Sequence, residues 1–332
     1  MKKFLAILLA AMMLLSVASV AMAEGTTTPT DQETVTIKKI YRNVNVAGAS
    51  PAETFTLKQV GDGKVTDGEA TSAPALGTIT GATYKYMGAT TTGAEANITV
   101  ALPSYDKVGV YEYTLKEVAN NTAGVTYYGG EIKLVVTVIN DGTGKLRVAA
   151  VHTEGEGEDK KDSFENTYSA GILTIDKTVA GNLGDKTKDF EFTVTFTAPE
   201  GKDWKMYHDG EYLSINAAAN QYGSVQASTP TIVDNTITYT LTLKDGGRVS
   251  FGNLPYGVTY TVTETAVEDY KTDKTGDTGT INAPTQEAKF INTKTGTIDT
   301  GVVLDTLPYV LVLAVVGAAV IAMIAKKRNA ED

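Results

Sequence analysis

The sequence predicts an all-β chain that forms two tandem immunoglobulin-like β-sandwiches. Thr, Val, Gly and Tyr are abundant, and the central residues lack long stretches of helical periodicity. Short runs of alternating apolar and polar residues recur between turns that contain glycine. The second half of the chain repeats the plan of the first, and 332 residues are enough for two domains of ordinary size.

Charge and composition exclude several classes of function. The formal net charge of -10 at pH 7 argues against nucleic acid as a partner, because nucleic acid would require a basic face. The chain has no cysteine, which excludes disulfides, thiolate catalysis and zinc–thiolate sites. His152 and His208 lie in no metal-ligand or triad spacing, so we expect them on the surface or in strands. We therefore predict no cofactor, no metal and no enzyme with a turnover substrate.

Residues 1–23 have the pattern of a secretory signal peptide. Lys2 and Lys3 precede an apolar run over residues 4–20, and an Ala-Met-Ala site ends at Ala23. We expect cleavage after Ala23 and export of the rest of the chain. A threonine-rich leader over residues 24–33 would then begin the mature protein.

Residues 295–332 have the pattern of a second targeting segment, at the C-terminus. The stretch 309–325 is almost wholly apolar and three basic residues follow it, so we expect a membrane-spanning helix with a cytoplasmic tail. The Thr-Ile-Asp-Thr-Gly motif lies just before this stretch. The order resembles the sorting signal of Gram-positive surface proteins, which implies sortase cleavage between Thr300 and Gly301. The usual proline before the Thr-Gly pair is missing, and a permanent single-span anchor is the alternative.

The first predicted domain, residues 34–169, contains a clear hairpin. Its two strands are 132–139 and 145–151, and the turn between them is rich in Asn, Asp and Gly. A charged loop then leads to the last strand. The other strands predicted here are 35–41, 54–58, 97–102, 113–117 and 163–168.

The second predicted domain, residues 170–294, follows the same plan. Its strand 189–196 places Phe190, Phe192, Val194 and Phe196 on one face. An aromatic and polar insertion over residues 203–212 is interpreted as a strand pair, or alternatively as a ligand contact. The other strands predicted here are 173–179, 236–243, 255–264 and 288–293.

Three short motifs occur in the same order in both halves. The first strand carries an inward lysine, a later strand reads Tyr-x-x-x-Glu, and the last strand reads Phe-x-Asn-Thr. The motif residues are Lys39, Glu117 and Asn166 in the first half, and Lys177, Glu264 and Asn292 in the second.

Strand periodicity places each lysine on an apolar face, where an unpaired ammonium group is very costly. Lys38 is a rival of Lys39, but its parity places it on the outer face. A lysine near a strand end can also extend to water, which is the alternative for any single site. Burial lowers the pKa of a lysine and raises that of a glutamate. The lysine could then attack the asparagine carboxamide while the glutamate moves protons, forming a Lys–Asn isopeptide bond.

On these motifs and both end signals, the chain resembles the major shaft pilins of Gram-positive pili of the streptococcal type, with tandem isopeptide domains. The resemblance implies bonds from Lys39 to Asn166, assisted by Glu117, and from Lys177 to Asn292, assisted by Glu264. It also implies that a sortase joins Thr300 of one subunit to a lysine of the next. Lys160 and Lys161, in the charged loop, are the candidate acceptors, unless that loop is an ordinary solvated charge run.

The sequence therefore predicts a structural subunit of a covalent pilus. The only reaction that the subunit would catalyse is its own internal crosslinking. Its expected partners are a sortase, identical subunits and minor pilins, with a passage through the membrane before sorting. It would be secreted and then displayed on the cell surface. A cell-wall-anchored adhesin or minor pilin, displayed singly, is the alternative function.

Overall fold

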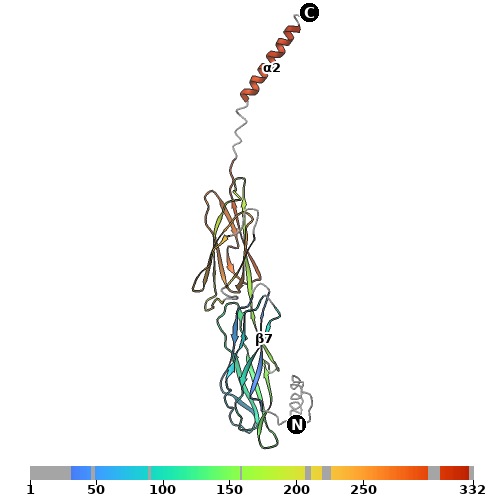
Figure 1. Ribbon diagram of the computed structural model, residues 1–332, viewed down its shortest axis with the longest axis vertical. Helices are drawn as coiled ribbons and strands as arrows, with labels where there is room; N and C mark the ends of the chain where they lie inside the picture. Colours follow the sequence, from blue (N-terminus) through green and yellow to red (C-terminus); the bar gives the residue numbers. More distant parts are fainter. Residues whose placement is uncertain are drawn as a thin grey trace.

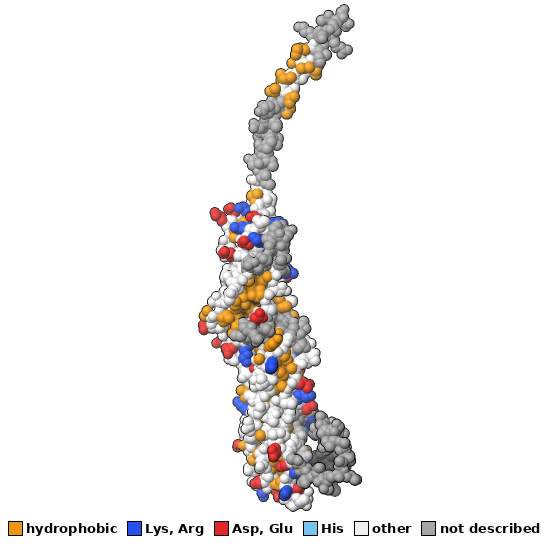
Figure 2. Space-filling view, in the orientation of Figure 1, with side chains coloured by type: hydrophobic (Ala, Val, Ile, Leu, Met, Phe, Trp, Pro, Cys, Tyr) orange, Lys and Arg blue, Asp and Glu red, His pale blue; other side chains and the backbone are white. Residues whose placement is uncertain are grey.

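A computed structural model describes residues 31–45, 49–88, 91–157, 159–205, 211–218, 226–297 and 307–328. Strands dominate these residues, and they form two β-sandwiches arranged end to end (Figure 1). The predicted all-β class is confirmed. On the face drawn in Figure 2, Lys and Arg side chains lie interspersed with Asp and Glu.

The first sandwich contains strands from the first half of the chain. One sheet has the order β5 (Ile79–Thr80), β7 (Ala94–Ala101), β1 (Thr34–Asn43), β12 (Ser163–Tyr168) and β9 (Val125–Thr126). The other has the order β11 (Leu146–Glu154), β10 (Glu131–Asn140), β8 (Gly109–Glu117) and β3 (Leu57–Gln59), with β4 (Lys64–Gly68) also paired to β8. A small separate sheet joins β2 (Glu53–Phe55) and β6 (Ala82–Tyr84).

The second sandwich contains strands from the second half. One sheet has the order β15 (Ser214–Ala218), β19 (Arg248–Pro255), β13 (Ala170–Ala180), β23 (Thr285–Thr293) and β21 (Lys271–Thr275). The other has the order β16 (Gln226–Ala227), β18 (Thr236–Leu243), β14 (Phe190–Thr197), β20 (Thr259–Glu264) and β22 (Thr278–Thr280), with β17 (Thr231–Val233) also paired to β18.

Alternation of apolar and polar residues builds both cores. In β14, Phe190, Phe192, Val194 and Phe196 are buried, while the residues between them face outward. The predicted hairpin forms as β10 and β11. The predicted strand 54–58 is divided instead, because the chain changes partner there: β2 pairs with β6, and β3 pairs with β8.

In both sandwiches the first and last strands lie side by side and parallel. Lys39 of β1 is opposite Phe164 of β12, and Lys177 of β13 is opposite Phe290 of β23. The asparagine of each last strand lies two residues beyond that phenylalanine, on the same face. The two halves therefore share one register, which brings each lysine diagonally next to its asparagine.

Hydrogen bonds and an ion pair join the two sandwiches. Asp203 donates its backbone N–H to the Asn121 carbonyl over 2.8 Å and accepts at its own carbonyl from the Ala123 N–H over 3.0 Å. Lys205 of the second sandwich forms a 2.8 Å ion pair with the buried carboxylate of Glu53 in the first. These contacts join the two sandwiches directly, in keeping with the short connection between β12 and β13.

Asp203 and Lys205, at the start of the insertion over residues 203–212, thus contact the first sandwich, and residues 206–210 of the predicted strand pair lie outside the described residues. Trp204 within it is half-buried and donates its indole N–H to the Asn235 carbonyl over 2.9 Å. His208 lies outside the described residues.

The apolar run near the C-terminus forms helix α2 (Leu307–Arg328). Within the described parts of the chain, no helix is long and apolar enough to cross a membrane. The predicted signal peptide, most of the leader, and the Thr300–Gly301 cleavage site lie outside the described residues.

Candidate functional site

In the first sandwich, three strands bring Lys39, Glu117 and Asn166 together inside the core. Lys39 and Asn166 come from neighbouring strands of one sheet, and Glu117 reaches them from the end of β8 in the facing sheet. The Lys39 and Glu117 side chains are each only 1% exposed, and Asn166 is fully buried. A lysine that extended to water would show far greater exposure, so that alternative does not hold here.

The three side chains form a closed set of hydrogen bonds. The Lys39 amine donates to Glu117 Oε2 and, over 2.7 Å, to Asn166 Oδ1. Asn166 Nδ2 donates to Glu117 Oε1 over 2.5 Å. The glutamate carboxyl therefore bridges the lysine nitrogen and the carboxamide nitrogen, with one oxygen on each.

Aromatic rings surround the Lys39 amine. Its Nζ lies 5.4 Å from the ring centre of Phe55 and 5.9 Å from that of Tyr128. Burial lowers the pKa of Lys39, and the neighbouring Glu117 carboxylate opposes that shift. Burial therefore shifts Lys39 toward its neutral form, which is the nucleophilic one.

The second sandwich repeats the arrangement with Lys177, Glu264 and Asn292. Lys177 Nζ lies 3.1 Å from Glu264 Oε1, and Asn292 Nδ2 donates to that same oxygen over 2.9 Å. The lysine and glutamate side chains are 0% and 3% exposed, and Asn292 is fully buried. The Phe190 ring centre lies 4.1 Å from Lys177 Nζ.

Burial shifts both ionisable groups of this second site toward their neutral forms. It lowers the pKa of Lys177, against the attraction of Glu264. It raises the pKa of Glu264, against the attraction of Lys177 and the hydrogen bond from Asn292. Burial thus shifts the lysine toward its neutral amine form and the glutamate toward its protonated form.

The two sites differ at the carboxamide oxygen. Asn166 Oδ1 accepts a 2.8 Å hydrogen bond from the backbone N–H of Tyr128, in addition to the one from Lys39. Among the described residues, Asn292 Oδ1 has no hydrogen-bond partner, and neither has Glu264 Oε2. Sequence reasoning missed the Tyr128 contribution, because a backbone N–H leaves no signature in residue type.

The rival and acceptor lysines lie on the surface. Lys38 is 42% exposed and pairs with Glu95 over 3.2 Å, so its side chain faces outward. Lys160 and Lys161 are both exposed, just before β12. The Lys161 amine lies 5.3 Å from the ring centres of both Tyr128 and Phe164.

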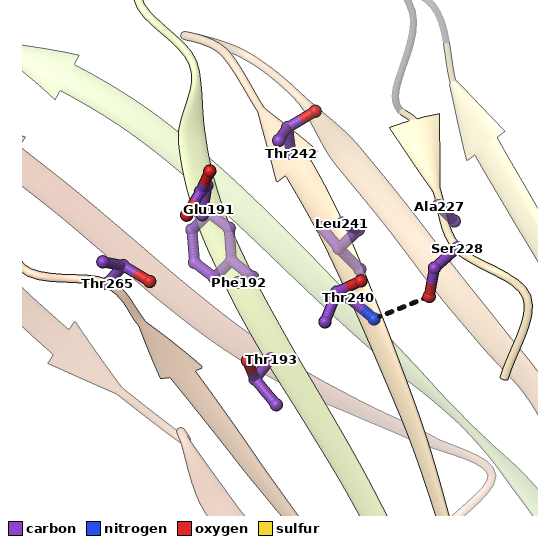
Figure 3. A pocket seen from close by; sticks show the side chains of 9 residues that line it. All are labelled: Glu191, Phe192, Thr193, Ala227, Ser228, Thr240, Leu241, Thr242 and Thr265. Carbon is purple, nitrogen blue, oxygen red and sulfur yellow. Dashed lines mark hydrogen bonds between the residues drawn. The ribbon is translucent and has the colours of Figure 1, made fainter. Parts of the chain in front are cut away.

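A separate hollow lies on the second sandwich between β14, β16 and β18 (Figure 3). Threonines dominate its lining, which includes one acidic residue, Glu191, and Ser228 Oγ accepts from the Thr240 N–H over 3.0 Å. None of the six motif residues lines it. The chemistry-bearing side chains are thus in the cores and not in this hollow.

Two family models match successive parts of the chain. Residues 30–169 match the Spy0128-like isopeptide containing domain (FctA), and residues 171–294 match a domain of unknown function, DUF7601. The chain is 30% identical over 324 residues to a pilin of Streptococcus pyogenes serotype M1, covering 89% of this chain and 91% of that protein.

Other similarities agree in kind. The crystal structure of the major pilin from Streptococcus pyogenes matches with a TM-score of 0.54 and 25% identity, covering 80% of this chain and all of that one. A Streptococcus pyogenes pilus tip adhesin, Cpa, is 33% identical over 122 residues, which are 37% of this chain but only 15% of the adhesin. The similarity to pilins spans both sandwiches, whereas the similarity to the adhesin is local.

Proposed function

Because the chain belongs to the streptococcal-type major pilins, structural subunits of surface pili, we propose that each of its sandwiches closes one Lys–Asn isopeptide bond upon itself. One bond joins Lys39 to Asn166, and the other joins Lys177 to Asn292. The observation that carries this proposal is the recurrence of one buried Lys–Glu–Asn cluster at the same strand register. The two self-crosslinking units are residues 34–169 and 170–294.

The reaction needs no other reactant. The neutral lysine amine attacks Cγ of the asparagine, a C–N bond forms, and the bond from Cγ to Nδ2 breaks. The lysine nitrogen loses one proton and the departing Nδ2 gains one, so ammonia leaves. Glu117 suits this transfer because one of its oxygens contacts the nucleophile and the other contacts the leaving group. Glu264 has the corresponding role in the second sandwich, with both contacts on Oε1.

Burial of the reacting groups favours the product, because an ammonium group held in an apolar core is costly. Amide formation removes the titratable amine for good and leaves a neutral linkage in an apolar core. Fixing the first strand to the last also limits the freedom of the unfolded chain, by the same argument that applies to disulfides.

Intact mass spectrometry of the purified residues 31–297 tests self-crosslinking. The mass of the chain without substitutions is expected to be lower than the mass calculated from its sequence by two molecules of ammonia. Glu117→Ala should restore the mass of one and Glu264→Ala that of the other, because each removes the proton carrier of one site.

Glu112→Ala is the matched control, since Glu112 lies on the same strand as Glu117 but faces outward. It should keep both deficits. If the chain without substitutions had the mass calculated from its sequence, self-crosslinking would be rejected for both sandwiches.

Assembly into a fibre requires chemistry between subunits. We propose that the chain is exported by its signal peptide, that a sortase cleaves it between Thr300 and Gly301, and that the Thr300 acyl group passes to Lys160 or Lys161 of another copy. The exposure of both lysines supports this role. Minor pilins would join the same polymer through the same class of reaction.

A further inference from the structure

We propose that the backbone N–H of Tyr128 is the oxyanion donor of the first crosslinking site, and that the second site lacks such a donor. The inference rests on the proposed isopeptide chemistry and concerns its rate. Its starting point is the hydrogen bond of 2.8 Å from Tyr128 N to Asn166 Oδ1.

This hydrogen bond determines how the Asn166 carboxamide is turned. A backbone N–H can only donate, so the group that faces it must be the amide oxygen. The amide nitrogen is then turned toward Glu117 Oε1, where it donates over 2.5 Å. The leaving group therefore faces the proton carrier before any reaction begins.

The same N–H also lies where negative charge develops. When the lysine nitrogen attacks Cγ, the carbonyl oxygen gains charge, and the lysine must give up its own 2.7 Å contact with that oxygen to approach the carbon. The Tyr128 N–H then remains as the donor to the oxygen. One preorganised donor at such a position contributes roughly 10²–10³-fold to rate in enzymes.

The second site provides the contrast within the same chain. Asn292 is fully buried, yet its Oδ1 has no hydrogen-bond partner among the described residues. Within the described parts of the chain, its carboxamide makes one hydrogen bond, from Nδ2 to Glu264. The first sandwich should therefore crosslink faster than the second.

An amide-to-ester exchange isolates the donor. In a Lys177→Ala background, where only the first site can react, the α-hydroxy analogue of tyrosine placed at position 128 replaces N–H by oxygen and keeps the ring. Crosslinking is followed by intact mass at intervals after cell-free synthesis. We expect the loss of ammonia to slow by about 10²-fold.

Tyrosine itself, placed at position 128 by the same method in the same background, is the matched control, because it differs from the ester variant only in the N–H. It should crosslink at the rate of the parent. Resistance to thermolysin shows whether the ester variant is folded. A folded ester variant that crosslinks as fast as this control would overturn the inference.

A second comparison needs no backbone change. Lys177→Ala reports the first site alone, and Lys39→Ala reports the second alone. The first should lose its ammonia at least tenfold faster, and equal rates would contradict the proposed role of Tyr128. If neither site lost ammonia, the isopeptide proposal itself would fail, which is a separate result.

Discussion

Lys39 and Lys177 each occupy a strand position that an apolar side chain would ordinarily fill. Their amines are buried beside aromatic rings, and each has a carboxyl group within reach. Such a placement is costly for a permanent ion pair, but it suits a reaction that consumes the amine. In the proposed reaction, each lysine is thus a reactant whose position is determined by strand parity.

The pH dependence of crosslinking at the second site follows from its two shifted groups. Acid protonates Lys177 below its lowered pKa and removes the nucleophile, while alkali ionises Glu264 above its raised pKa and removes the proton donor. The rate should therefore pass through a maximum and fall on both sides. It can be measured in Lys39→Ala by intact mass after synthesis at a series of pH values.

Glu264→Gln serves as the comparison, since it keeps the shape of the side chain but cannot exchange protons. It should crosslink slowly at every pH. A rate for Lys39→Ala that continued to rise into the alkaline range would contradict the role given to Glu264.

At the scale of elements, parallel pairing of the first and last strands unites lysine and asparagine. Strand parity in the sequence was sufficient to predict the inward lysines, and the repeated order of Lys, Glu and Asn predicted which residues meet. The structure adds the register, in which the asparagine lies two residues beyond the residue opposite the lysine. That diagonal distance suits the long lysine side chain.

Other features could not be predicted from residue type. The hydrogen bond from Tyr128 depends on where a loop backbone passes, and any residue except proline could supply it. The division of residues 54–58 between two sheets depends on which strands compete for that edge. The contacts of Asp203 and Lys205 depend on how the sandwiches meet, which alternation within one sandwich does not determine.

Exchanging two neighbouring residues of β13 tests the parity argument without a change of composition. In the double variant Lys177→Thr with Thr178→Lys, the lysine moves to the exposed face of the strand. By intact mass, this variant should be lighter than its sequence mass by one molecule of ammonia instead of two.

Thr178→Lys alone is the control, because it adds the outward lysine and keeps the inward one. It should retain both deficits. Retention of both by the double variant would show that strand parity does not select the reactive lysine.

At the scale of the molecule, the two sandwiches lie end to end, and polar contacts join them. Loop backbones from both sides pair at Asn121 and Asp203, and the Lys205–Glu53 ion pair lies beside them. Gly124 has a φ of +77° at this joint, and a Cβ there would lie 2.8 Å from the Ser169 carbonyl oxygen. A side chain at this position would therefore disturb both the backbone and the contact.

Polymerisation is tested on the whole chain with a pilus sortase. Cell-wall extracts should show a ladder of covalent multimers on a denaturing gel, and Thr300→Ala should abolish it by removing the acyl donor. Arginine at the acceptor lysine, Lys160 or Lys161, should abolish the ladder as well, because a guanidinium group is not a nucleophile under these conditions.

Lys145→Arg is the control, since Lys145 is another exposed lysine, in the turn between β10 and β11. Its ladder should match that of the parent. A ladder that survives in the double variant, Lys160→Arg with Lys161→Arg, would exclude this loop as the acceptor.

The closeness of the charged loop to β12 determines how a fibre would carry tension. In the proposed fibre, load that enters at Lys160 or Lys161 would run along β12, cross directly into β13 and reach Lys177. From there the proposed amide passes it to Asn292 and on toward Thr300. Almost all of the first sandwich, and every residue between Lys177 and Asn292, would then carry no tension. Of the two isopeptide bonds, only the second would be stretched. The first would hold β12 in its sheet, while the neighbouring strands carry no load.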